Sequence, residues 1–320
     1  MRPLFPLPGA HGTIEVMNEL IEQTAAFGCM QWGDRADADQ SAAMFDACLA
    51  AGLTHFDTAW GYAGGASEVI LGTLAAPMRD RLTIATKVAF DGGAGPANIL
   101  AQFDDCRRRL RMDRVDLLYI HRWHPADPLD ATIATLADLQ DRGLIGTIGL
   151  SNHPAWVVMK AQGLAAGHGT SIAAIQPMLN LVKRQVEVEL LPMARDQGIA
   201  AFCYSPLGGG LLTGKYAAGG SGRIDTNANY RLRYGQPAMR QAAADLARIA
   251  AEAGADPATL AVAWVMTHPL GPKPILSAAS LAQLAPSLAG LTHALPADLR
   301  ARLTALYPSP APATDRTEET

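Results

Sequence analysis

Residues 82–90 read LTIATKVAF, an apolar run that carries a single charged side chain, Lys87. Seven other runs of similar character begin near residues 25, 54, 115, 145, 174, 199 and 272. Continuous apolar runs of this length are typical of strands that are covered on both faces, as in a parallel sheet. The sequence therefore predicts eight buried strands.

Helical patterns lie between these runs. Residues 38–51 place Ala42, Phe45 and Leu49 at helical spacing and stop before Gly52, which favours a helix end there. Residues 237–253 place a longer apolar stripe on one helical face, formed by Met239, Ala243, Leu246, Ile249 and Ala250. Strands that alternate with helices in this way predict a (β/α)8 TIM barrel. A doubly wound sheet is the rival fold, but it requires a Gly-rich fingerprint after the first strand, which the sequence lacks.

The spacing of the runs predicts one domain with one long loop. From the second to the seventh run, the starts are about 25–33 residues apart, whereas the last two are about 73 apart. A long Gly-rich loop after strand 7, at the C-terminal mouth of the barrel, is expected to serve function. We expect an N-terminal arm over 1–24, a barrel over 25–306 and a disordered Pro-rich tail over 307–320.

Composition excludes several classes of protein. The chain has 320 residues, of which 49% are hydrophobic and 18% charged, so a large core is available and wholesale disorder is excluded. The net charge of -4 argues against a nucleic-acid partner. No apolar run reaches the roughly 18 residues of a membrane helix, and the first residues lack the apolar stretch of a secretion signal. We expect neither a membrane partner nor secretion.

The four cysteines, Cys29, Cys48, Cys106 and Cys203, are scattered and form no C-x-x-C pair. We interpret them as free buried thiols in a reducing compartment, which predicts a cytoplasmic protein. No grouping of His, Cys or acidic residues has the spacing of a metal site, so no metal is expected. The sequence carries no signal for an oligomeric state.

Four unusual side chains follow the ends of predicted strands: Asp57, Tyr62, Lys87 and His121. Charged groups at such places are costly to bury singly, but Lys87 can pair with Asp57 and stay charged. The charge of Lys87 is expected to lower the pKa of Tyr62 from its reference of about 10. Tyr62 could then exchange a proton with a carbonyl oxygen, which a neutral His121 would orient. Taken singly, an Asp–Lys pair can also hold a fold together, and a Tyr can simply pack.

Longer motifs around these residues resemble the aldo-keto reductase family. They are FDTAWGYAGGASEVILG (56–72), ATKV (85–88), DLLYIHRW (116–123), GLIGTIGLSNH (143–153), IQPMLNLVKRQ (175–185) and GIAAFCYSPLGGGLLTGKY (198–216). The first resembles the family's Asp-Thr-Ala-x-x-Tyr segment and the Gly-Ser-Glu-x-x-x-Gly segment after it. The resemblance runs from roughly residue 25 to 305. It implies that Asp57, Tyr62, Lys87 and His121 form a catalytic tetrad with Tyr62 as general acid/base.

The resemblance also implies a nicotinamide cofactor lying extended across the barrel mouth. Ser151, Asn152 and Gln176 would hold its carboxamide, and Tyr204 would stack on its ring. The remaining contacts would come from the first strand and from the loop around the pyrophosphate: Gly28, Cys29, Met30, Ser205, Leu207, Gly208, Gly210 and Lys215. From the residues alone, Ser151 and Asn152 can also cap the next helix, and Tyr204 can be a core aromatic.

The segment PILSAASLAQLAPS (274–287) departs from the family pattern. Gln283 is kept, but Ser277, Ala279 and Ser287 stand where the family often has Gly, Arg and Asn in its cofactor-binding segment. The missing Arg would have bound the 2′-phosphate of NADP(H) in a bidentate pair. NADP(H) is still favoured over NAD(H), because another cation can take this role, the candidates being Lys273, Arg223, Arg231 and Arg233.

Three tryptophans fall at or just past strand ends, namely Trp32, Trp60 and Trp123. They predict an apolar substrate pocket, with packing at the barrel rim as the alternative. Together these features predict an NAD(P)H-dependent oxidoreductase that interconverts an aldehyde or ketone and an alcohol. The alternatives are an NAD(P)-linked aldose dehydrogenase acting on a sugar, and a cofactor-sensing regulatory subunit with little turnover.

Overall fold

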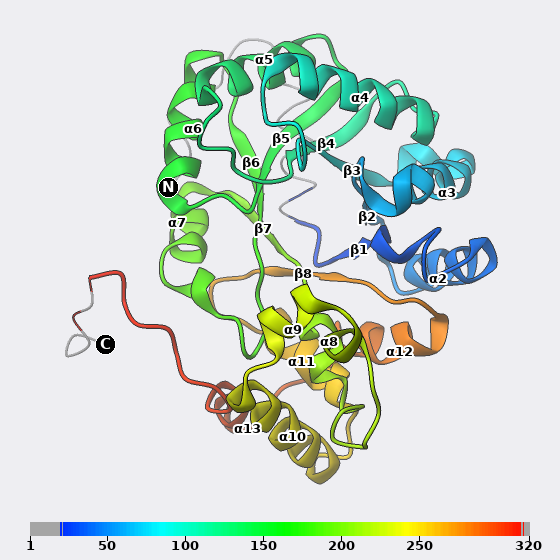
Figure 1. Cartoon of the computed structure of the whole chain (residues 1–320), viewed down its shortest axis with the longest axis vertical. Coiled ribbons are helices and arrows are strands. Elements are labelled where there is room, and N and C mark those ends of the chain that lie inside the picture. The colour runs from blue at the N-terminus through cyan, green and yellow to red at the C-terminus, as the bar shows by residue number, and fades with distance from the viewer. Residues whose placement is uncertain (1–19, 21, 315, 317–320) are drawn as a thin grey trace.

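A computed structural model of the chain describes residues 20, 22–314 and 316. Eight parallel strands follow one another in chain order and close into a barrel (Figure 1). They are β1 (Ala26–Gly28), β2 (His55–Asp57), β3 (Thr83–Val88), β4 (Val115–Ile120), β5 (Ile145–Ser151), β6 (Ile172–Gln176), β7 (Ala200–Cys203) and β8 (Lys273–Leu276). The prediction of a (β/α)8 barrel is confirmed.

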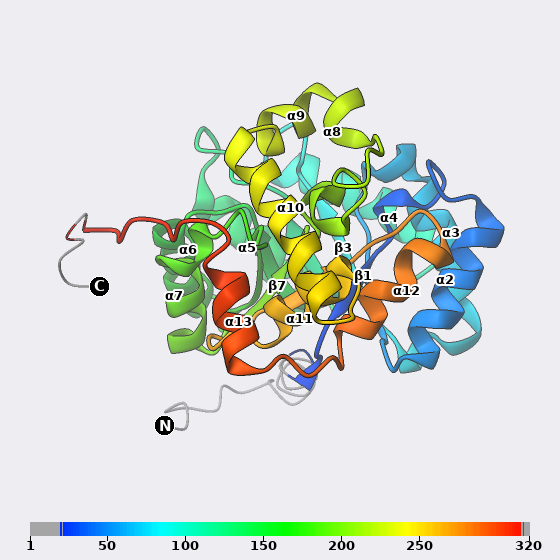
Figure 2. The same cartoon turned by 90° about the horizontal axis from the view of Figure 1, so that it is seen from below.

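Helices surround the strands on the outside of the barrel (Figures 1 and 2). They are α2 (Ala38–Ala50), α3 (Ala66–Ala75), α4 (Pro96–Leu110), α5 (Leu129–Asp141), α6 (Ala155–Gly167), α7 (Leu190–Gln197), α11 (Pro257–Met266) and α12 (Leu281–Gly290). Helix α2 ends as its sequence predicts, but its buried face is rotated slightly. Phe45 is buried, whereas Ala42 and Leu49 are half-buried, because Met44 and Cys48 take the positions that face the sheet.

The long connection between β7 and β8 is more ordered than a loop. It contains the 3₁₀ segment η5 (Gly208–Thr213), two short helices, α8 (Arg223–Thr226) and α9 (Ala228–Tyr234), and the longer α10 (Pro237–Glu252). Both views show α8 and α9 next to each other (Figures 1 and 2). On α10, every residue of the predicted apolar stripe is buried. Helix α10 is therefore as the sequence predicts, whereas α8 and α9 lie in the stretch where the sequence predicts only a Gly-rich loop.

The barrel interior combines small and large side chains. Five alanines, at positions 26, 85, 173, 174 and 200, pack among larger side chains such as Leu117, Tyr119 and Phe202. A second, larger cluster of aliphatic and aromatic side chains lies between the strands and the helices. Interior alanines leave room for the few polar side chains that point inward, among them His55, whose two ring nitrogens have no hydrogen-bond partner.

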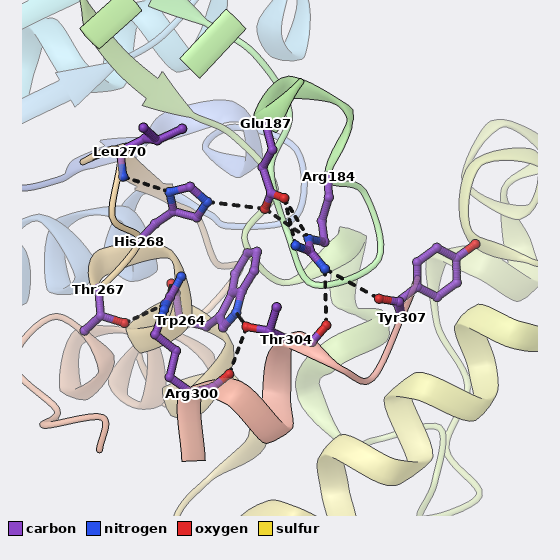
Figure 3. Close-up of polar contacts among 9 residues, drawn as sticks. All are labelled: Arg184, Glu187, Trp264, Thr267, His268, Leu270, Arg300, Thr304 and Tyr307. Carbon is purple, nitrogen blue, oxygen red and sulfur yellow. Dashed lines mark hydrogen bonds and ion pairs between the residues drawn. The ribbon is translucent and has the colours of Figure 1, made fainter. Parts of the chain in front are cut away.

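The C-terminal helix α13 (Ala297–Thr304) is fixed to the barrel by a polar network (Figure 3). The Arg184 guanidinium pairs with Glu187 at 2.8 Å and donates to the Thr304 carbonyl oxygen at 3.2 Å. From the other side, Arg300 on α13 donates to the carbonyl oxygen of Trp264 on α11 at 2.6 Å. The two guanidinium carbons lie 5.6 and 5.3 Å from the centroid of the Trp264 ring. These contacts tie three distant parts of the sequence together.

The predicted terminal segments are only partly described. Of the predicted arm over 1–24, residues 1–19 and 21 lie outside the described residues. Of the predicted tail over 307–320, residues 307–314 and 316 are described and contain neither helix nor strand, and the others lie outside the described part. Within the described chain, no helix has both the length and the apolar character needed to cross a membrane.

Candidate active site

The polar residues singled out in the sequence gather at the C-terminal ends of neighbouring strands. Asp57 is the last residue of β2, Lys87 is the next to last of β3, and His121 follows β4 directly. Ser151 and Gln176 end β5 and β6. Because adjacent parallel strands end at the same rim of the barrel, five separate stretches of sequence meet at one place.

Asp57 and Lys87 form a buried ion pair with 2.5 Å between Oδ1 and Nζ. Gln176 Nε2 donates to the other carboxylate oxygen at 2.9 Å, and Lys87 Nζ also donates to the Thr58 carbonyl oxygen at 2.7 Å. Burial opposes the charge of Lys87, but the attraction of Asp57 and Tyr62 outweighs it and raises the pKa of the ammonium group above its usual value. Lys87 therefore stays charged in the site.

Tyr62 begins a 3₁₀ turn, η2 (Tyr62–Gly65), directly beyond β2. The Lys87 ammonium nitrogen lies 4.9 Å from the centroid of the Tyr62 ring. Burial raises the pKa of Tyr62, and the charge and hydrogen bond of Lys87 lower it only in part, so that the net direction is upward. This corrects the expectation of a lowered pKa: desolvation of the phenol outweighs the field of the ammonium group. At neutral pH the phenol keeps its proton and can donate it.

His121 faces Tyr62 edge to face, with ring centroids 5.8 Å apart. Burial, together with the charges of Lys87 and Arg122, lowers the pKa of His121 to about 3. The imidazole is therefore neutral at pH 7, so one ring nitrogen carries a hydrogen and the other is an acceptor. The second ring contact of His121 is with Phe90, at 4.9 Å between centroids.

A cavity of about 910 Å³ opens above these groups. Asp57, Tyr62 and His121 line one end of it, together with Trp60. Lys87 has a fully buried side chain and lies behind the wall, where it reaches the cavity only through its contacts with Asp57 and Tyr62. The volume is at the upper end for small-molecule pockets, so the cavity suits a ligand larger than a simple carbonyl compound.

A chain of hydrogen-bonded polar residues also lines the cavity. Tyr204 Oη donates to Asn152 Oδ1 at 2.7 Å, and Asn152 Nδ2 donates to Ser151 Oγ at 3.0 Å. Ser151 Oγ in turn donates to the Gln176 carbonyl oxygen at 2.9 Å. Neither Ser151 nor Asn152 caps the next helix, whose first flanking residue is Pro154. Tyr204 lines the cavity and also packs against the barrel core. Asn152 has a left-handed backbone, with φ of 57°, as found where function constrains a turn.

Two further groups of predicted residues line the same cavity. One comes from β1 and the start of the β7–β8 connection and comprises Gly28, Met30, Ser205, Leu207, Gly210 and Lys215. The other follows β8 and comprises Ser277, Ala279, Gln283 and Ser287. Gly209, which the sequence analysis did not single out, also lines it.

Four predicted contacts lie away from the cavity wall. Cys29 and Trp32 are fully buried in the outer core, where the Trp32 ring packs 5.4 Å from Phe27. Gly208 is buried beneath the wall that Gly210 lines. Trp123 packs edge to face on Trp156, with 5.4 Å between centroids. Of the three tryptophans proposed for a substrate pocket, only Trp60 lines the cavity, and packing accounts for Trp32 and Trp123.

The cavity is rich in positive charge. Arg35, Lys215 and Arg223 all line it, and the charges of Arg223 and Arg35 help burial to lower the pKa of Lys215. No ion pair joins these three to a carboxylate in the part of the chain that the structure describes, and the nearby Asp225 pairs with Arg240 at 3.4 Å instead. The charge of Asp225 offsets the repulsion at Lys215 only in part, so the three cations together favour an anionic ligand.

Two of the candidate substitutes for the missing arginine lie elsewhere. Lys273 begins β8 at the opposite end of the barrel, where Nζ donates to the Gln23 carbonyl oxygen. Arg231 is turned toward the backbone of α8, donating to the carbonyl oxygens of Ile224 and Asp225. Arg35, which sequence reasoning missed, lines the cavity in their place. Its position just after the first strand end was the available signal, since loops at this end of a barrel carry ligand contacts.

Among the described residues, no three His, Cys, Asp or Glu side chains gather in an arrangement that could hold a metal ion. The four cysteines are buried and free of disulfides.

Comparison with known proteins places the chain in a family. The model of the aldo/keto reductase family matches residues 25–308. Aflatoxin B1 aldehyde reductase member 2 of Rattus norvegicus is 37% identical over 195 residues, which are 59% of this chain and 53% of that protein. The uncharacterized oxidoreductase YrpG of Bacillus subtilis is 28% identical over 307 residues, 88% of this chain and 91% of that protein.

A third relative bears a different kind of name. A probable voltage-gated potassium channel subunit beta of Oryza sativa is 30% identical over 269 residues, 78% of this chain and 81% of that protein. The chain spans little more than half the length of the aflatoxin aldehyde reductases that it matches. The family model, in contrast, covers nearly the whole chain from β1 to beyond α13. The chain belongs to the aldo/keto reductase family.

Proposed function

We propose that this protein is an NAD(P)H-dependent oxidoreductase that interconverts an aldehyde or ketone and an alcohol. The observation that carries the proposal is the meeting of Tyr62, Lys87 and His121 at one end of a large cavity. A protonated phenol and a neutral imidazole stand side by side there, and both can donate a hydrogen bond to a carbonyl oxygen. Two relatives named as reductase or oxidoreductase support the same class of reaction.

The described residues fit a nicotinamide dinucleotide. The same cavity is lined by Tyr62 and His121, by amide and hydroxyl side chains, and by several arginines and Lys215, a combination that suits a ligand with a polar ring and phosphate groups. Asn152 and Gln176 would hold the carboxamide, Tyr204 would stack on the ring, and Lys215 would lie near the pyrophosphate. When bound, this cofactor supplies the hydride.

The chain's own residues would supply proton transfer and orientation. Tyr62 would give its proton to the carbonyl oxygen during reduction and take it back during oxidation. Lys87 would stabilise the phenolate that results, while Asp57 holds Lys87 in place at 2.5 Å. Neutral His121 would donate an N–H to the same oxygen and so orient the carbonyl carbon. Trp60 would form an apolar wall beside the reacting group.

NADP(H) is the proposed cofactor in preference to NAD(H), with Arg35 in place of the missing arginine. Arg35 lies three residues before α2, and α2 approaches the segment after β8 where Gln40 Oε1 accepts from the Leu281 backbone N–H at 3.4 Å. A cation at this point can reach the neighbourhood of Ala279, where the family often has its arginine. We expect a cytoplasmic protein, since its cysteines carry no disulfide.

A second candidate function is that of a cofactor-sensing subunit with little turnover. The relatives named as potassium channel beta subunits favour it, since they match more than three quarters of the chain. The complete set of Asp57, Tyr62, Lys87 and His121 favours an enzyme. An NAD(P)-linked aldose dehydrogenase would use the same residues to oxidise a sugar, which is the reverse direction of the carbonyl reduction proposed here.

Binding and turnover can be tested separately. Fluorescence titration with NADPH and with NADH measures which cofactor binds, and a panel of aldehydes, ketones and sugars then measures loss or gain of reduced cofactor. The proposal expects tight NADPH binding and turnover of at least one carbonyl class. Tight binding without turnover in either direction would favour the cofactor-sensing subunit, and absence of binding would refute both functions.

A further inference from the structure

The segment that follows the catalytic tyrosine has no part in the chemistry proposed above. It reads Gly65-Ala66-Ser67-Glu68 and ends with Gly72, and it forms the start of α3. The structure places this segment against the last turn of α4. Its contacts there involve a buried charge, two glycines and the turn that carries Tyr62.

Glu68 is the buried charge. Its side chain is fully buried, and its carboxylate accepts from Thr86 Oγ1 at 2.8 Å and from Arg109 Nη1 at 3.2 Å. Thr86 directly precedes Lys87 on β3, and Arg109 lies on the last turn of α4. A buried carboxylate requires a partner of opposite charge, and Arg109 is the cation bonded to it.

Arg109 also holds the backbone of the turn next to the tyrosine. The same Nη1 atom donates to the Trp60 carbonyl oxygen at 2.7 Å, and the guanidinium carbon lies 5.6 Å from the centroid of the Trp60 ring. On the preceding turn of α4, Asp105 Oδ2 accepts from Trp60 Nε1 at 3.1 Å. Trp60 is therefore held at its carbonyl group and at its indole by one helix, two residues before Tyr62.

Two glycines make this approach possible. Gly65 has a left-handed backbone, with φ of +98°, and a Cβ atom there would lie 2.6 Å from the Arg109 guanidinium carbon. A Cβ atom on Gly72 would lie 2.2 Å from the Leu110 carbonyl oxygen. Side chains at either position would push α4 and its arginine away from the turn. The Gly–x–Ser–Glu–x–x–x–Gly segment is therefore the surface against which the end of α4 packs.

We propose that Arg109 is a positioning residue that sets the place of Tyr62 by fixing the Trp60–Tyr62 turn from α4. This inference rests on the proposed function, because it concerns the geometry of that proton donor. Arg109 is not among the residues that line the cavity, so it would act only through Trp60 and Glu68. A displacement of the proton donor by about 1 Å can lower the rate on the order of 10²-fold, so loss of the Arg109 contacts should lower kcat.

The test compares Arg109→Gln with a matched control, Arg79→Gln. Arg79 likewise pairs with a carboxylate, that of Asp116 at 2.8 Å, which is 17% exposed where Glu68 is fully buried, and the Arg79 side chain is 23% exposed against 27% for Arg109. Arg79 also donates to a backbone carbonyl, that of Leu82 at 3.0 Å, but it lies at the opposite end of β3 from the site. Both variants lose an ion pair, and only Arg109→Gln also loses the hydrogen bond to the Trp60 carbonyl oxygen.

We expect Arg109→Gln to lower kcat by about 10- to 100-fold with the dissociation constant for NADPH nearly unchanged, and Arg79→Gln to change kcat by less than about twofold. Hydrogen exchange over residues 59–66 should accelerate in Arg109→Gln alone. Arg109→Lys should recover part of the loss, because a single nitrogen of Arg109 makes both bonds. If Arg109→Gln fails to fold, the double variant Arg109→Met/Glu68→Gln is used in the same assays instead. It removes both charges of the ion pair.

Two outcomes would overturn the inference: a wild-type kcat in Arg109→Gln, or equal acceleration of exchange over 59–66 in both variants. The second would show that the ion pair serves stability alone. If the wild-type protein turns over no carbonyl compound, the proposed function fails, and hydrogen exchange still decides whether Arg109 fixes the turn.

Discussion

The ammonium nitrogen of Lys87 lies 4.9 Å from the centroid of the Tyr62 ring, and it is the strongest influence that opposes desolvation of the phenol. Lys87 is itself kept charged by Asp57 behind it. The pair therefore sets how readily Tyr62 loses a proton, although burial keeps its pKa above the usual value. This arrangement predicts how the proposed proton transfer depends on pH.

Replacement of Lys87 by Met should shift the pH dependence of alcohol oxidation upward. Without the ammonium group, the pKa of Tyr62 rises further, so the phenolate needed to accept a proton in oxidation forms only at higher pH. We expect losses on the order of 10²–10⁴-fold in kcat at neutral pH. Steady-state rates of oxidation over a range of pH measure this. A uniform loss with an unchanged pH profile would show that Lys87 holds the structure of the site and does not tune the phenol.

Replacement of Arg35 by Ala should weaken NADPH binding selectively. If Arg35 contacts the 2′-phosphate, its loss removes a charge-assisted contact worth roughly 1.5–3 kcal/mol, or about 10- to 150-fold in the dissociation constant for NADPH. NADH, which lacks that phosphate, should bind almost as before. Lys215→Ala is the matched control, since a residue near the pyrophosphate should affect both cofactors alike. A parallel loss for NADPH and NADH in Arg35→Ala would remove Arg35 from the 2′-phosphate site.

Stability should fall in mild acid because of His55. Burial and the charges of Lys87 and Lys273 lower the pKa of His55 to about 3 in the folded protein, against about 6.5 in the unfolded chain. The unfolded state therefore binds more protons, and the stabilisation by neutral His55 is complete above pH 6.5 and is lost as pH falls toward 3. Each such histidine gives a slope of up to about 1.4 kcal/mol per pH unit.

His55→Leu should accordingly reduce the pH dependence of the free energy of unfolding between pH 6 and 4 by the contribution of about one proton. Denaturant titrations at several pH values measure it. His121 and His153, with pKa values lowered to about 3 and about 4, should account for the slope that is left. An unchanged slope in the variant would mean that His55 titrates alike in the folded and unfolded states.

Arg184 should matter for stability and not for catalysis. Its side chain is only 8% exposed, and its removal leaves Glu187 half-buried with only His268 as a polar partner, at 3.3 Å (Figure 3). Breaking such a pair costs about 3–5 kcal/mol, and Arg184→Gln also loses the bonds to α13. We expect a loss of about 3 kcal/mol in denaturant titration with normal cofactor binding. A loss below about 0.5 kcal/mol, as for a surface pair, would contradict the network's role.

The barrel and the meeting of polar side chains at one rim of it were predictable because they depend on local patterns. Continuous apolar runs report strands that are covered on both faces, and Asp57, Lys87 and His121 were found because charged or polar groups at strand ends interrupt those runs. The two short helices within residues 208–236 were not predicted, since that stretch is rich in Gly and polar residues and lacks an apolar stripe.

Other features depended on distances that no single stretch of sequence contains. Trp32 and Trp123 sit near strand ends, yet only packing against Phe27 and Trp156 decides that they point away from the cavity. The direction of the pKa shift of Tyr62 depended on how much water burial removes, which residue types do not reveal. Arg109 is one of several arginines at the end of α4, and only the fold shows which of them reaches the catalytic turn.

The measurement that bears most directly on the account is the turnover of Tyr62→Phe with the preferred carbonyl substrate. This change removes one hydroxyl group and leaves the ring against His121, so the fold and the cofactor site should be preserved. We predict a fall in kcat of about 10²–10⁴-fold, with the dissociation constant for NADPH within about twofold of wild type. Turnover near the wild-type rate would contradict the role of Tyr62 as the proton donor.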